Sequence, residues 1–152
     1  GISWLVGLEE MPVHEGFELF VDRTVDFCFE NPDGLQGLMQ NIAQVQKLED
    51  VPGIHYFPRY TASIQKLFTE NIRLQAPKAD IALWVNGFVM IMNSCVGASA
   101  YHASVLEMEP ESKAYRQWVK DLLMFLFYPT LKQLVFSGRN NQSTDHQSPA
   151  ES

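Results

Sequence analysis

One stretch of the sequence constrains the fold more than any other, because it carries no charge. From Ile81 to Leu106 there is no Asp, Glu, Lys or Arg. About 20 apolar residues span a bilayer, so length alone permits a membrane helix. Polar side chains that are costly in hydrocarbon interrupt the run, however, and a positive flank or an aromatic belt is not present at both ends. These are Asn86, Asn93, Ser94, Ser99, Tyr101, His102 and Ser104. The sequence therefore favours a buried helix of a soluble protein.

Helical phase divides this uncharged run into two faces. One face carries Ile81, Trp84, Val85, Phe88, Ile91, Met92, Cys95, Ser99 and His102. The other carries Leu83, Gly87, Met90, Ser94, Ala98, Tyr101 and Val105. Two apolar faces need two partners, and small residues such as Gly87 and Gly97 allow another helix to approach closely. The large side chains of the first face either wall a cavity or fill a core, and both possibilities stay open at this point.

Helical periodicity also dominates the rest of the chain. It predicts a helix from about Val13 to Glu30, a second that follows the Asn31 to Gly34 turn and ends near Val45, and a third after Pro58. A fourth helix begins at Pro77 and contains the uncharged run. The last begins near Pro110 and contains Pro129, which should kink it. We therefore predict an all-α fold, a bundle of about five to six helices.

The composition changes at both ends of the chain. Residues 1–10 resemble the end of a helix whose beginning is missing, so we expect a fragment of a longer protein, and the first residues do not resemble a signal peptide. Residues 11–136 form the predicted helical domain. Residues 137–152 are rich in Ser, Asn, Gln, Asp and Pro, a composition that buries too little apolar surface to offset the entropy of ordering. We predict a disordered tail there.

Charge and cysteine content exclude some classes of function. The formal net charge is -7, and the eleven basic residues are scattered, which opposes binding to a phosphate backbone. Two cysteines, Cys28 and Cys95, are too few for the disulfide framework of a small secreted domain. We therefore expect a cytoplasmic location and no nucleic-acid binding by this chain itself.

No arrangement of residues indicates catalysis, a metal or a cofactor. The sequence lacks a Gly-x-Ser-x-Gly elbow, a phosphate-binding loop and a complete dinucleotide fingerprint. Cys95 and His102 share one face, and Cys28, His14 and His55 could join them, but their spacing matches no zinc motif. Helical phase places four carboxylates on the polar side of the first helix, where a solvated face explains them. They are Glu15, Glu18, Asp22 and Asp26. We predict a protein that is not an enzyme.

The C-terminal half resembles a known family. The passage GASAYHASVLEMEPESKAYRQWV at 97–119, followed by a Leu-rich helix with YPTL at 128–131, resembles the C-terminal region of TetR-family transcriptional regulators. The resemblance implies a helical domain that binds an effector and dimerises through its last two helices. In that family a separate N-terminal helix-turn-helix domain binds DNA, so residues 1–10 would correspond to the helix that connects the two domains. No residue-level functional motif of the family carries over.

Two functions of different class follow. The first is ligand sensing and dimerisation in a TetR-like regulator, with a small, largely apolar effector. Helical phase turns the candidate ligand-binding residues toward a common interior: Phe20, Phe27, Phe68, Trp84, Phe88, Met92 and Cys95. The candidate dimer interface comprises Ala98, Tyr101, Trp118, Leu122, Phe125 and Leu126. The second function is a helical oligomerisation or interaction module with no small-molecule ligand.

Overall fold

Proline and apolar periodicity set the first two helices. In the computed structural model, which describes residues 12–44, 47, 59, 61–66 and 76–140, α1 is Val13–Glu30 and α2 is Pro32–Gln44. Pro12 precedes the first turn of α1, and Asn31 ends the helix by donating its backbone N–H to Phe27 O. Proline at the start suits this position because it lacks the backbone N–H that a residue inside a helix needs. Asparagine at the end is a residue that can cap a helix. The predicted bounds of the first helix are confirmed.

The uncharged run forms two helices instead of one. After Pro77, α4 spans Lys78–Gly97, and α5 spans Ser99–Val105. The prediction of one helix to Leu106 is therefore wrong at Ala98, whose φ of -113° and ψ of 34° leave the helical region. Tyr115 contacts α4 just before this break, where its O–H donates to Cys95 O at 2.6 Å.

The last helix, α6, spans Lys113–Asn140 and continues through Pro129. It is longer than the sequence predicted, since 137–140 were assigned to the tail and 141–152 lie outside the described residues. The third predicted helix is described only at 59 and 61–66, which are helical. Across the described residues every regular element is a helix, so the predicted all-α class is confirmed.

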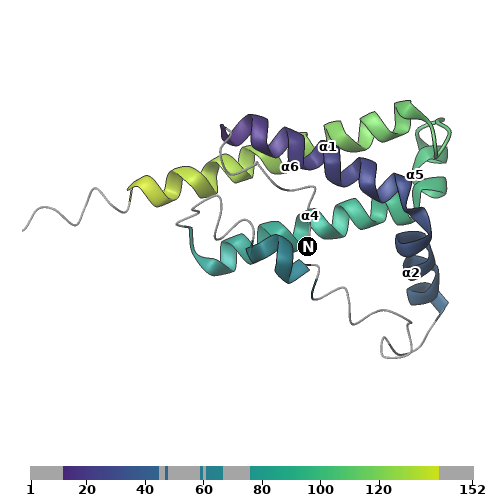
Figure 1. The fold of residues 1–152 in the computed structure, drawn as a ribbon, viewed down its shortest axis with the longest axis horizontal. Helices are drawn as coiled ribbons and strands as arrows, with labels where there is room; N and C mark the ends of the chain where they lie inside the picture. Colours follow the sequence, from purple (N-terminus) through teal and green to yellow (C-terminus); the bar gives the residue numbers. More distant parts are fainter. Residues whose placement is uncertain (1–11, 45–46, 48–58, 60, 67–75, 141–152) are drawn as a thin grey trace, which may run out of the picture.

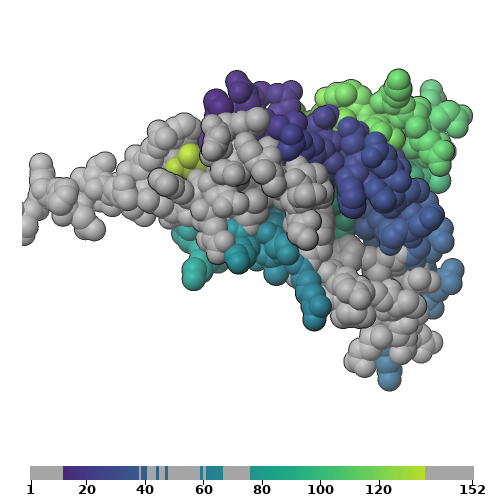
Figure 2. Space-filling view, viewed as in Figure 1, coloured from purple at the N-terminus to yellow at the C-terminus, as the bar shows by residue number. Residues whose placement is uncertain are grey.

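Three long helices form the bundle, and ring and charge pairs give their directions. Phe17 lies beside Trp84, and Phe20 lies beside Phe88 one turn further along both helices, so α1 and α4 are parallel. Phe17 also lies beside Tyr128 while Asp22 pairs with Lys120, so α1 and α6 are antiparallel, as Figure 1 shows. In the space-filling view, α1 and the first half of α6 lie next to each other along the upper edge of the molecule (Figure 2). The hydrophobic core lies where these three helices meet.

The second helix crosses one end of the bundle and packs on α4 (Figure 1). Gly97 makes this approach possible, because a Cβ at that position would overlap the Met39 side chain. The predicted role of a small residue here is therefore confirmed. Among the described helices, α4 is long and apolar enough to cross a membrane, and half of its most apolar window is buried. Core helices of soluble proteins share these properties.

Candidate functional site

The inner face of α4 brings together most of the predicted ligand-binding residues. The side chains of Phe20, Trp84, Phe88, Met92 and Cys95 are all buried. Phe27 is not among them, because its side chain is 46% exposed near the end of α1. Phe27 lies at the edge of the apolar stripe of α1, and a side chain at the edge of such a stripe becomes exposed to water when the helix is rotated slightly about its axis. Phe68 lies outside the described residues.

These buried rings pack directly on one another. The ring centroids of Phe20 and Phe88 are 5.4 Å apart, and those of Trp84 and Phe88 are 5.8 Å apart. Phe127 of α6 closes the cluster, with its ring centroid 5.3 Å from that of Phe88. Such separations are those of rings in contact. Among the described residues the aromatic cluster is therefore a filled core at this point, and effector binding there stays a prediction.

Trp84 connects this cluster to α6 through its one polar atom. Its indole Nε1–H donates to Phe127 O at 3.1 Å and to Thr130 Oγ1 at 3.0 Å. Both acceptors lie close in sequence to Pro129, which lacks the backbone N–H of a helical residue. The two hydrogen bonds join α4 to this turn of α6 and satisfy the indole N–H.

The outer faces of α4 and α6 form one uncharged surface. The Trp84–Phe127 and Tyr115–Cys95 contacts set the register, which places Met90 at the level of Leu122. Side-chain exposures reach 75% for Leu83, 70% for Met90 and 78% for Phe125. We call this surface the α4–α6 outer face, and its members are Leu83, Gly87, Met90, Ser94, Ala98, Trp118, Leu122, Phe125, Leu126 and Pro129. None of them is ionisable.

Most of the predicted dimer-interface residues lie on the α4–α6 outer face. Tyr101 on α5 is 69% exposed, Phe125 and Leu126 are also exposed, and Ala98, Trp118 and Leu122 are half-buried. Five of the six belong to the outer face as defined, and Tyr101 continues it onto α5. His102 follows Tyr101 and shares a hydrogen bond of 3.0 Å between its Nε2 and Ser94 Oγ. Dimerisation itself stays a prediction.

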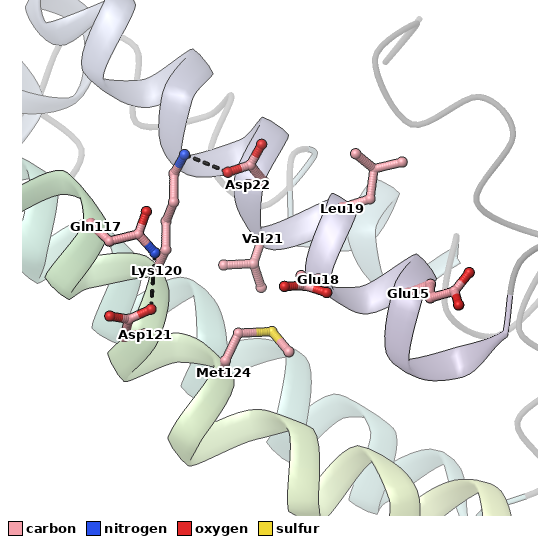
Figure 3. Close-up of a pocket in the computed structure, with 9 residues that line it drawn as sticks. All are labelled: Glu15, Glu18, Leu19, Val21, Asp22, Gln117, Lys120, Asp121 and Met124. Atoms are coloured by element: carbon pink, nitrogen blue, oxygen red, sulfur yellow. Dashed lines mark hydrogen bonds and ion pairs between the residues drawn. The ribbon is translucent and has the colours of Figure 1, made fainter. Parts of the chain in front are cut away.

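A hollow between α1 and α6 was not predicted from the sequence. It has a volume of about 320 Å³ and is lined by Glu15, Glu18, Leu19, Val21, Asp22, Gln117, Lys120, Asp121 and Met124. In Figure 3, Val21 and Met124 project into the space between the two helices, while Glu18 reaches over it. Lys120 closes one end through its contact with Asp22. We call this hollow the α1–α6 groove.

Two of the four carboxylates assigned to a solvated face instead bind α6. Lys120 Nζ lies 2.9 Å from Asp26 Oδ1 and also contacts Asp22, and Arg116 Nη1 lies 3.4 Å from Asp26 Oδ1. Burial lowers the pKa of Lys120, but its hydrogen bonds and charge interactions with Asp22 and Asp26 outweigh this and raise it. The ammonium group is thus already neutralised within the chain.

The buried thiols and the buried phenol are held in their neutral forms. Burial raises the pKa of Cys28 to about 11 and also raises that of Cys95. Burial, with a smaller contribution from Cys95, raises the pKa of Tyr115 to about 12. The thiolate is the reactive form of cysteine, so neither thiol has the environment of a nucleophile. Among the described residues, no three His, Cys, Asp or Glu side chains are placed to hold a metal.

No protein-family model, curated protein or solved structure matches this chain.

Proposed function

We propose that this chain is the ligand-sensing and dimerisation domain of a TetR-like transcriptional regulator. The observation that carries the proposal is the α4–α6 outer face, where large apolar side chains are exposed on two adjacent helices without any ionisable group. Exposed apolar patches of this kind mark interaction surfaces. A second copy is the occupant that fits best, because an uncharged face is complementary to itself in a twofold interface.

The family assignment rests on the resemblance at 97–119 and 128–131, which covers α5, the turn after it and part of α6. In that family a separate helix-turn-helix domain binds DNA, so this domain would pair two DNA-binding units and respond to an effector. The acidic chain itself would not bind duplex DNA.

The oligomeric mass of the chain tests the dimer directly. Light scattering at micromolar concentration should give twice the chain mass of 17.3 kDa. Phe125→Glu places a carboxylate in the outer face and should give a single-chain mass with unchanged helical content. Gln117→Glu adds the same charge on the side of α6 that lines the α1–α6 groove, outside the outer face, and should remain dimeric. A monomeric wild-type protein would contradict the proposal.

The ligand-sensing part rests on the resemblance and on the aromatic cluster. A ligand at a hundredfold excess over its dissociation constant stabilises the folded state by about 2.7 kcal/mol, which is visible as a melting shift. A library of apolar acyl and aromatic compounds should therefore contain a stabiliser. The packing of Phe20, Trp84 and Phe88 against one another favours the alternative, a helical oligomerisation module. A dimer that no compound stabilises would support that alternative.

A further inference from the structure

We propose that protonation of His102 dissociates the dimer. This inference rests on the proposed dimer through the α4–α6 outer face, and it adds a regulatory group to that surface. His102 lies at one end of the face, on the short helix α5 that follows α4. Histidine is the residue type whose charge ordinarily changes between about pH 5 and 8, so a histidine at this place can make an uncharged face charged.

Two contacts hold the imidazole ring of His102 beside the outer face. Its Nε2 shares a hydrogen bond of 3.0 Å with the Oγ of Ser94, a member of that face. Its ring centroid lies 5.3 Å from that of Tyr101, edge to face, and Tyr101 continues the face onto α5 with 69% exposure. The half-buried ring of His102 is therefore fixed next to residues that a second copy would cover.

No negative charge is paired with His102. Among the described residues, the ion pairs of the chain join other side chains, and none includes His102. The outer face has no ionisable member, so the same face of a second copy supplies no carboxylate either. On α4 itself, Lys78 and Asp80 lie in the first turn, roughly 20 Å along the helix from Ser94.

The ionisable groups closer in sequence to His102 do not balance its charge. They are Cys95 on α4, Tyr101 on α5, Glu107, Glu109 and Glu111 in the following turn, and Lys113 and Arg116 at the start of α6. Burial raises the pKa of Cys95, so that thiol stays neutral, and Arg116 is held by Asp26. The three glutamates are exposed, and water and salt weaken their attraction for a cation that they do not contact.

A positive charge at this position opposes dimerisation. When the imidazole is neutral, a second copy removes apolar area from water at little electrostatic cost. An imidazolium would have to be covered without a partner carboxylate, which is more costly than covering a neutral polar group. A twofold interface includes this cost once for each copy. Association should therefore release a proton from each chain and weaken as the pH falls.

The direction of this effect distinguishes it from general electrostatics. The chain carries a formal net charge of -7 with its histidines neutral. Acidification makes the chain less negative and lowers the repulsion between two copies, which by itself favours dimers. Weaker association at lower pH therefore identifies a cationic group at the interface.

Sedimentation equilibrium of the full chain at pH 8 and pH 6, at equal ionic strength, tests the proposal. The dimer dissociation constant should rise roughly tenfold at pH 6, because two protons are taken up for each dimer that dissociates. His102→Gln keeps a hydrogen-bonding group for Ser94 but does not titrate, so its dissociation constant should not rise. His102→Lys is positively charged at both pH values and should already associate weakly at pH 8. Circular dichroism should give the same helical content for both variants.

The matched control is His14→Gln, at a histidine of α1 whose side chain is 53% exposed beside Glu18. Because α1 contributes no residue to the outer face, this variant should keep the wild-type rise in dissociation constant. An equal rise in His102→Gln, or a wild-type constant that does not rise at pH 6, would overturn the inference and leave the dimer intact. A wild-type protein that is monomeric at pH 8 would instead contradict the dimer itself, and this inference with it.

Discussion

The two faces of α4 have similar apolar residues but different surroundings. On the inner face, Phe88 and Met92 are covered by side chains of α1 and α6. On the outer face, Leu83 and Met90 are exposed, as are Phe125 and Leu126 of α6. Hydrophobicity alone therefore does not place a residue in a core. What differs is whether the same chain supplies the covering side chains, and only the inner face has its complement within the described fold.

A pair of truncations on α4 should separate the two faces most clearly. Phe88→Ala removes a buried ring from the aromatic cluster and should lower the free energy of unfolding by about 3–5 kcal/mol, through lost burial and the cavity left behind. Leu83→Ala, on the outer face, should change the stability of the isolated chain by less than about 0.5 kcal/mol. Urea unfolding at low protein concentration measures both values. Equal losses would show that the outer face is also covered.

The same comparison shows what sequence analysis could predict about the fold. The bounds of α1 and the start of α4 depend on local features, Pro12 and Pro77 together with apolar periodicity, and these were visible in the sequence. The break at Ala98 was not, because Gly97, a residue type that commonly ends helices, was interpreted as a site of close helix contact. It accompanies the hydrogen bond from Tyr115 to Cys95, which joins two distant parts of the chain.

The prediction of sites was limited in the same way, because it could not anticipate contacts between distant parts of the chain. Helical phase turned Phe20, Trp84 and Phe88 inward, as the structure shows, but phase does not give the distances that distinguish a filled core from a cavity. The α1–α6 groove was missed because its carboxylates form a regular polar stripe on α1. Only the pairing of α1 with α6, through Lys120 and Asp22, makes that stripe one wall of a hollow.

One tyrosine and one cysteine extend the comparison to alkaline pH. Tyr115 is buried with its pKa raised to about 12, and Cys28 has its pKa raised to about 11, so both stay neutral in the folded chain where the unfolded chain would lose a proton. The contribution of these two neutral groups to the free energy of unfolding is complete below pH 8.5 and is lost as the pH rises toward 12. Each two-unit shift corresponds to roughly 2–3 kcal/mol at the upper end of this window.

Urea unfolding at pH 7.5, 9 and 10.5 should therefore show stability falling with pH. Tyr115→Phe should reduce the fall in stability between pH 9 and pH 10.5, and at pH 7.5 it should cost about 1–3 kcal/mol, because it leaves a buried carbonyl without its donor. A Tyr115→Phe slope equal to that of wild type would contradict the assignment.

The smallest expected effect concerns the turn that brings α6 back over α4. Met108 N–H donates to Ala103 O at 2.9 Å and Glu107 N–H to Ser104 O at 3.1 Å, the two bonds of a Schellman motif at the end of α5. This motif puts Glu107 at a φ of 57°, a left-handed conformation that is strained for any residue with a Cβ. Glycine relieves the strain but makes the unfolded chain more flexible.

Glu107→Gly should therefore increase the free energy of unfolding by up to about 1 kcal/mol, equivalent to a melting shift of roughly 2–4 °C for a chain of this size. Glu109→Gly, in the same turn but without a positive φ, should instead cost stability. The turn contributes no residue to the α4–α6 outer face, so light scattering should give the same mass for Glu107→Gly as for wild type. A gain in stability accompanied by a change in mass would mean that the turn and the outer face are coupled, and the two faces of α4 would then not be independent.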